Sequence, residues 1–184
     1  MKISAIGASV AVVVASVASA DVTYTFVNQT WTGFNFNAAF GAGTLTGSIT
    51  AVKANATLDA QTNQTYADDL CIYVASNPNY GTGGGLLQVG GVDDFLATQK
   101  YSWTNGGSSA PGTVVFSTRF LNTAISMAAN PNAIVYVGNG YGAGSGTWTG
   151  TITLVGVELA PVPAPGAVAL LGLAGAIGGR RRRA

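Results

Sequence analysis

The residues of this sequence that could carry out chemistry are two pairs of neighbouring aspartates, Asp68-Asp69 and Asp93-Asp94. Carboxylate oxygens are the hard ligands that Ca²⁺ prefers, and carboxyl groups brought together by loops can serve as acid and base on a sugar. Neighbouring side chains on a strand point to opposite faces, so adjacency alone does not make a site. Three interpretations stay open: solvated turn residues, a structural calcium ion, or catalysis.

Composition closes most other routes to catalysis. The chain has no histidine and one cysteine, Cys71, which excludes Ser-His-Asp and Cys-His nucleophiles and histidine-based zinc and iron sites. Cys71 lies between Leu70 and Ile72 in an apolar run, so we expect a small buried hydrophobe that makes no disulfide. We predict no enzymatic activity and no cofactor, with calcium as the one ion left open.

Aromatic residues indicate binding as an alternative function. Flat aromatic faces stack on pyranose rings, while Asn, Gln and Asp recognise sugar hydroxyls. The candidates for such a platform are Trp31, Trp103, Trp148, Tyr80 and Tyr141. Packing in the core is the competing interpretation for each tryptophan. A carbohydrate-binding module of an exopolysaccharide matrix, with calcium as a stabilising ion, is therefore the alternative function.

The charge of the chain is concentrated at its ends. Five of the eight basic residues, Lys2 and Arg180–Arg183, lie in the terminal segments, which leaves three basic against seven acidic residues between them, a net charge of −4. The middle of the chain therefore lacks the basic surface that nucleic-acid binding requires, and that class is excluded.

Residues 1–20 are typical of a secretory signal peptide. Lys2 precedes an apolar stretch, and small residues, Ala18 and Ala20, stand where signal peptidase requires them. We expect cleavage before Asp21. A retained N-terminal anchor is the competing interpretation, and the shortness of the apolar run argues against it.

The last residues, 161–184, form a second targeting segment. The apolar and glycine residues 166–179 would reach about 21 Å as a helix, short of the roughly 30 Å hydrocarbon core of a bilayer. Prolines before this run hold an extended peptide, and the arginines after it would stay on the cytoplasmic side. We expect a short transmembrane helix that pauses in the inner membrane and is cut free, with a permanent anchor as the alternative.

This ending resembles the PEP-CTERM sorting signal of bacteria. The resemblance rests on the Pro-x-Pro motif, the Ala/Leu/Gly run and the arginine cluster, and Ala164 stands where the family name has glutamate. The sorting motif of this chain comprises Val162, Pro163, Ala164, Pro165, Arg180, Arg181, Arg182 and Arg183, with Ala164 as its one departure from the family pattern. The resemblance implies processing by exosortase, a membrane enzyme thought to act as a cysteine-dependent transpeptidase, and export to the surface of a Gram-negative cell.

Between these segments the sequence predicts one all-β domain, residues 21–160. Period-two alternation, as in "VTYTFVNQTW" and "GTLTGSITAV", and Gly/Asn/Pro punctuation give about eight strands. Such a pattern favours a single β-sandwich, most simply a jelly roll. Residues 121–130 are the one segment that could be helical, and the glycine-rich residues 138–146 predict a flexible hairpin. The runs "YADDLCIYVAS" and "GTWTGTITLVGVEL" resemble strands of the jelly-roll P domains of subtilisin-like proteases.

Together these features predict an exported cell-surface or extracellular-matrix protein without enzymatic activity. Its partners would be an exosortase-like enzyme, the inner membrane in transit through residues 166–179, and an extracellular polysaccharide.

Overall fold

The protein is described by a computed structural model, which covers residues 21–76, 84–91 and 96–161. These residues form nine strands and one short 3-10 helix, η1 (Ala67–Asp69). The strands are β1 (Val22–Thr32), β2 (Phe36–Phe40), β3 (Leu45–Gln61), β4 (Leu70–Ala75), β5 (Gly85–Val89), β6 (Ala97–Tyr101), β7 (Val114–Ser126), β8 (Ile134–Asn139) and β9 (Ser145–Leu159). The predicted all-β class is confirmed.

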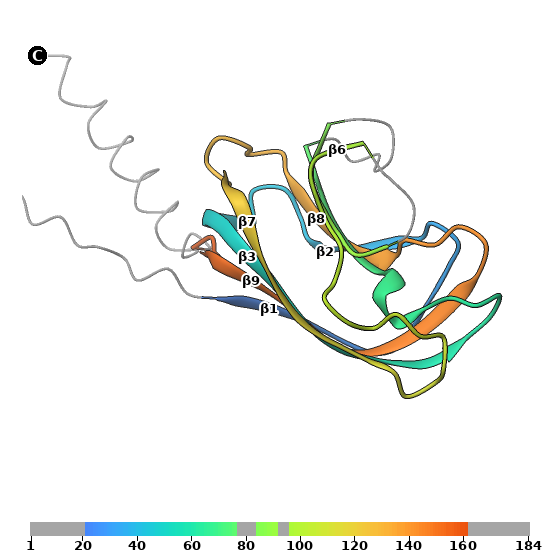
Figure 1. Ribbon diagram of the computed structural model, residues 1–184. Helices are drawn as coiled ribbons and strands as arrows, with labels where there is room; N and C mark the ends of the chain where they lie inside the picture. The colour runs from blue at the N-terminus through green and yellow to red at the C-terminus, as the bar shows by residue number, and fades with distance from the viewer. Residues whose placement is uncertain (1–20, 77–83, 92–95, 162–184) are drawn as a thin grey trace, which may run out of the picture.

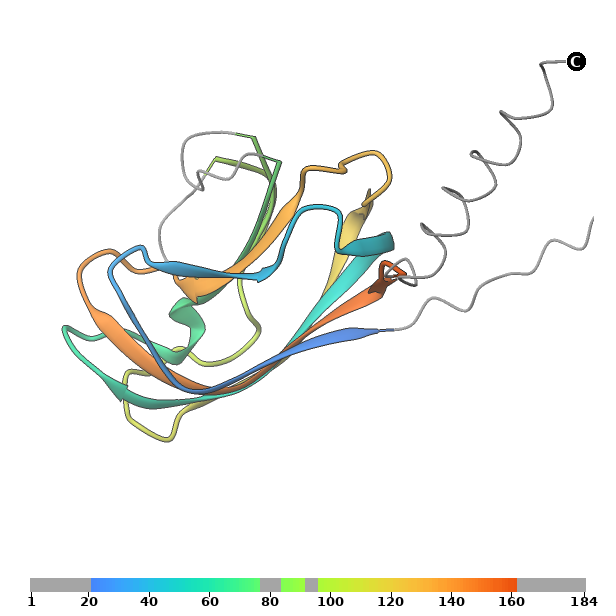
Figure 2. The ribbon, with the colours of Figure 1, turned by 180° about the vertical axis from the view of Figure 1, so that it is seen from behind.

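The strands make two sheets that face each other (Figure 1). The four-stranded sheet has the order β1-β9-β3-β7, and the five-stranded sheet has the order β2-β8-β4-β5-β6. Neighbouring strands are antiparallel except β5 and β6, which are parallel. Seen from behind, the longer strands of the four-stranded sheet curve beneath the shorter sheet (Figure 2). This arrangement is consistent with a β-sandwich.

Alternation along the strands fills the space between the sheets. On β3, Val52 and Ala54 are buried while Lys53 is exposed, and the inward residues of β4, Ile72 and Val74, belong to the same hydrophobic cluster. The period of two in the sequence therefore reflects one dry and one wet face of the four-stranded sheet. Strand β4 is buried on both faces, because Tyr73 and its same-side neighbours belong to a second cluster.

Two glycines permit a β-bulge where β3 meets β9. Gly47 and Gly156 both have a positive φ, 88° and 90°. A Cβ on Gly47 would lie 2.6 Å from the carbonyl oxygen of Gly156, and a Cβ on Gly156 would lie 2.4 Å from that of Ser48. Only glycine fits both the backbone conformation and the space, so these residues determine how the two longest strands bend.

Three local expectations are corrected or extended. The helix expected over residues 121–130 is wrong: β7 continues to Ser126, where it pairs with Ser48 of β3, and a turn follows. The glycine-rich residues 138–146 are not a hairpin of one sheet, because they connect β8 to β9 across the two sheets. Strand β6 was not predicted, because it is short and largely polar and shows no apolar alternation.

The described chain begins and ends at the same side of the sandwich (Figure 1). Val22 pairs with Leu154 on β9, and Leu45 pairs with Leu159, the last residue of that strand. Within the described residues no helix has the length and apolarity needed to cross a membrane. The predicted signal peptide, residues 1–20, and the predicted sorting residues, 162–184, lie outside the described ranges.

Candidate functional site

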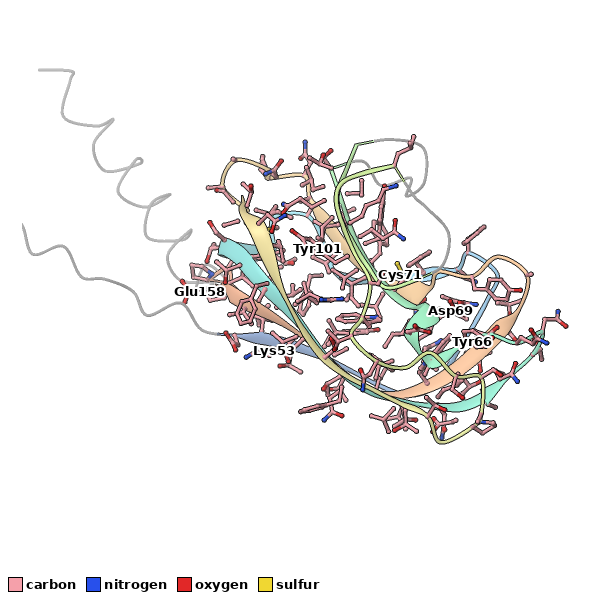
Figure 3. The ribbon with its side chains drawn as sticks, in the orientation of Figure 1. Lys53, Tyr66, Asp69, Cys71, Tyr101 and Glu158 are labelled. Atoms are coloured by element: carbon pink, nitrogen blue, oxygen red, sulfur yellow. The ribbon has the colours of Figure 1, made fainter. Side chains whose placement is uncertain are left out.

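The first aspartate pair contributes to the structure through η1. Asp69 is 1% exposed, and its Oδ2 accepts a 2.7 Å hydrogen bond from the backbone N–H of Tyr66. Figure 3 shows Asp69 beside Tyr66, at the end of the sandwich opposite Glu158. The backbone carbonyl of Asp68 accepts from Gly91 and that of Asp69 from Gly140, at 2.9 and 2.8 Å. This pair therefore ties together the loops that surround η1.

The two members of this pair differ in environment. Burial raises the pKa of the Asp68 carboxyl above its ordinary value, and a weaker backbone hydrogen bond opposes that shift. Its Oδ1 is buried without a hydrogen-bond partner among the described residues. Asp93 and Asp94 lie outside the described ranges, and the residues within them contain no group of three potential metal ligands. Among the described residues, therefore, no further carboxylates gather around Asp68 and Asp69.

Cys71 lies where the sequence predicted. It is fully buried on β4, and burial, reinforced by the nearby Asp69 carboxylate, strongly raises the pKa of its thiol. A thiol that stays protonated and inaccessible at neutral pH is a poor nucleophile. The residue therefore acts as a small hydrophobe in the packing of the five-stranded sheet.

The three tryptophans are core residues, which confirms the core interpretation and rules them out as a sugar platform. Trp31 and Trp148 are 1% and 0% exposed, and their ring centroids lie 5.8 Å apart. Trp103 is also buried, and its indole N–H donates to the carbonyl of Leu70 at 2.6 Å. Tyr141 is partly exposed, and Tyr80 lies outside the described residues. The indole N–H groups of Trp103 and Trp148 donate to backbone carbonyls, whereas that of Trp31 is buried without a hydrogen-bond partner among the described residues.

The two most exposed aromatic residues among those described are phenylalanines on the other side of the four-stranded sheet. Phe116 and Phe120 on β7 are 71% and 75% exposed. They share the face of this sheet that points away from the second sheet, which we call the outer face. Figure 3 shows Lys53, which belongs to the same face. The sequence analysis did not identify these two residues as exposed, because β7 carries apolar side chains on both of its faces.

The outer face has a hollow beside Phe116. Its volume is about 350 Å³. Its outward-pointing lining comes from three strands, with Lys53 and Asn55 of β3, Phe116 and Thr118 of β7, and Thr151 and Thr153 of β9. The ammonium of Lys53 forms a 2.9 Å salt bridge with the carboxylate of Asp21. The hollow is therefore lined by hydroxyls, an amide, one neutralised charge and one aromatic ring.

Threonine pairs order the rest of this face. The hydroxyls of Thr23 and Thr153 lie 2.8 Å apart, and those of Thr30 and Thr147 lie 2.7 Å apart, in both cases across β1 and β9. Such cross-strand hydrogen bonds reduce side-chain motion on a sheet surface. The outer face thus presents ordered hydroxyl groups next to exposed phenyl rings.

Side chains also cap the free edge of β7. The amide of Asn105 accepts from the N–H of Phe116 at 3.1 Å and donates to the carbonyl of Val114 at 3.4 Å. The amide of Gln99 accepts from the N–H of Thr123 at 3.1 Å and donates to its carbonyl at 2.9 Å. Each amide takes hydrogen bonds that a neighbouring strand would otherwise make. The caps therefore discourage another chain from pairing with this edge.

Comparison with known protein families, characterised proteins and solved structures finds no match to this chain.

Proposed function

We propose that this chain is an exported cell-surface or extracellular-matrix protein without enzymatic activity, sorted through its PEP-CTERM-like ending. The observation that carries the proposal is the position of the folded body in the sequence, because its strands fill the stretch between the two predicted targeting segments. Strand β1 begins at Val22, immediately after the expected cleavage before Asp21, and β9 ends at Leu159, just before the Pro-x-Pro region. Removal of both segments would leave every described strand intact.

The contact made by Asp21 supports cleavage at this position. Its side chain pairs with Lys53 on β3, so the first residue of the mature chain would already belong to the folded body. In this proposal an exosortase-like enzyme recognises Val162–Pro165 while residues 166–179 pause in the inner membrane. The four arginines, 180–183, fix the orientation of that segment. The body is then released or transferred to the cell surface.

We propose that the chain has no enzymatic activity on the basis of three features of its residues. The chain contains no histidine, its cysteine is buried with a raised pKa, and Asp69 serves as a hydrogen-bond acceptor within η1.

We also propose the jelly roll as the finer description of the sandwich. Without β6 the sheets have the orders β1-β9-β3-β7 and β2-β8-β4-β5. The first strand of the chain then lies beside the last, and the second beside the last but one, as in two Greek keys wound together.

A processing experiment in the producing cells tests this proposal. Changing Pro163 and Pro165 to alanine should leave precursor in the inner membrane, because the extended peptide presented for cutting would lose its rigidity. Changing the four arginines to glutamine should let the tail slip through uncut, whereas changing them to lysine keeps the charge and should preserve processing. Membrane fractionation with immunoblotting measures each outcome. Normal processing of the proline and glutamine variants would contradict the proposal.

A carbohydrate-binding module is the second candidate function. The specific observation that favours it is the outer face, where exposed phenyl rings adjoin a hollow lined by hydroxyl and amide groups. Carbohydrate binding is compatible with display at the cell surface, because a matrix protein would bind other matrix components outside the cell.

A further inference from the structure

The two exposed phenylalanines form a regular pair on the outer face. From Phe116, opposite Asn55, to Phe120, opposite Ala51, the pairing of β7 with β3 runs without a bulge. Both side chains therefore point the same way, with Thr118 between them. Four residues of a strand span about 13 Å. A chain of several pyranose rings can bridge that distance, while a single monosaccharide cannot.

Exposure of both rings is unfavourable for the isolated protein. Burying one phenylalanine side chain would stabilise a protein by about 1.5–3 kcal/mol, and apolar side chains on an edge strand promote aggregation. Other phenylalanines of this chain, Phe26 and Phe36, are buried, so the fold does place this type of side chain in its interior. Two rings at 71% and 75% exposure on one face therefore point to a surface that becomes covered.

The groups between the rings suit a sugar. A pyranose presents apolar C–H faces, which stack on phenyl rings, and equatorial hydroxyls, which exchange hydrogen bonds with amides and hydroxyls. Asn55 and Thr151 are directly opposite each other across β3 and β9, and both line the hollow beside Phe116. One side of a sugar ring could thus contact the phenyl group while its hydroxyls face Asn55 and Thr151.

Charge selects among polysaccharides. The one cation that lines the hollow, Lys53, is neutralised by Asp21 at 2.9 Å. The segment between the predicted signals carries three basic against seven acidic residues, so its net charge of −4 repels polyanions. A neutral polysaccharide would meet no unpaired charge in the hollow and no repulsion from the net charge.

Strand pairing with a second copy is a weaker explanation of the exposed rings. Asn105 already occupies hydrogen-bonding groups of β7 at Val114 and Phe116, and Gln99 does the same at Thr123. A second chain could reach the β7 edge only by displacing both amides.

We propose that the outer face binds a neutral, extended polysaccharide, with Phe116 and Phe120 as two stacking platforms and the hollow lined by Asn55 and Thr151 as the hydroxyl-binding subsite between strands β3, β7 and β9. This inference rests on the proposed function in one respect, that the face is displayed outside the cell.

Binding is tested with protein extracted from the surface of the producing cells. Affinity electrophoresis in gels containing a soluble neutral glucan measures the wild type and the variants Phe116→Ala, Phe120→Ala and the double variant. Each single substitution should weaken binding about threefold to tenfold, the value of one aromatic contact, and the double variant should lose more. Val27→Ala is the matched control, because Val27 is 68% exposed on β1 and does not line the hollow; it should bind as the wild type does.

The comparison arms decide between occupants. For the wild type and the double variant we measure binding to polyuronate and binding to phosphatidylcholine/phosphatidylglycerol vesicles. Sedimentation of the protein alone measures self-association. Retention by neutral glucan that falls in the double variant supports the inference. No retention of the wild type, retention unchanged in the double variant, a preference for polyuronate, or phenylalanine-dependent vesicle binding or self-association would each overturn it. Circular dichroism of every variant separates lost binding from lost folding. A protein that is processed at both ends but binds no glucan contradicts this inference and leaves the proposed function standing.

Discussion

The packing of Trp148 gives a prediction whose magnitude follows from the structure. The indole is fully buried, packs against Trp31 and donates a 3.3 Å hydrogen bond from its N–H to the carbonyl of Ala67. Removing a buried tryptophan costs about 3–5 kcal/mol, a large part of the roughly 5–15 kcal/mol by which a domain is stable. We expect Trp148→Ala to reduce the free energy of unfolding by that amount. A role in a sugar platform would instead predict little change in stability.

Gly146 provides the second half of a double-mutant cycle. It lies two residues before Trp148 on β9, and a Cβ built on it would lie 2.2 Å from the nearest atom of the indole. Gly146→Ala should therefore cost about 1–3 kcal/mol by overpacking. With Trp148 changed to alanine the new methyl enters vacated space, so the same substitution should cost less than about 0.5 kcal/mol. The coupling free energy, the difference between the two costs, should be about 0.5–3 kcal/mol.

Urea denaturation followed by far-UV circular dichroism measures all four proteins, since tryptophan fluorescence would change with the substitution itself. Thr147→Ala, on the outer side of the same strand, is the control and should cost less than about 1 kcal/mol. A Trp148→Ala variant within 1 kcal/mol of the wild type would refute the core assignment. Equal costs of Gly146→Ala in both backgrounds would refute the contact between Gly146 and the indole.

Three further predictions concern the β7 edge, η1 and the buried thiol. Gln99→Ala frees the backbone of Thr123, so we expect a loss of about 1 kcal/mol in urea denaturation and concentration-dependent association in sedimentation; an unchanged monodisperse protein would argue against the cap. Burial raises the pKa of Asp68, so the folded state binds this proton more tightly than the unfolded chain and the charged carboxylate lowers stability at neutral pH. Asp68→Asn should raise the free energy of unfolding at pH 7, and this gain should shrink as the pH falls through the folded pKa and be lost below about pH 4, where the unfolded carboxyl is protonated as well; a pH-independent difference would contradict the burial argument. Cys71, with its raised pKa, should resist iodoacetamide at pH 8 until urea unfolds the protein, as mass spectrometry of the alkylated protein would report; rapid alkylation of the native protein would show an accessible thiol.

Much of the two-sheet fold could be predicted because burial on one face leaves a period of two in the sequence. On β3 the alternation of Val52, Lys53 and Ala54 identifies both the strand and its inward side. Strand β6 shows no such pattern, because it is only five residues long and its residues, mostly polar, are exposed or partly buried. The helix expected over residues 121–130 failed because pairing of β7 with β3 overrides local propensity: Ile125 lies opposite Ile49, which only an extended chain allows.

The candidate site was harder to predict because aromatic type does not report exposure. For Trp31 and Trp148 the sequence left a sugar platform open beside the favoured core position, and the facing sheet decides between them. On β7, Val115 and Leu121 alternate with Phe116 and Phe120, so each face offers apolar side chains and the sequence does not say which face is dry. The hollow combines residues far apart along the chain, Asn55, Phe116 and Thr151, whose meeting depends on strand order.

Intact mass spectrometry of the protein extracted from the cell surface tests the central claim, export with removal of both terminal segments, most directly. The account predicts one species that begins at Asp21 and ends near Pro163–Pro165, with any transferred group visible as added mass at its new C-terminus. A surface species that begins at Met1, or one that retains Arg180–Arg183, would contradict it.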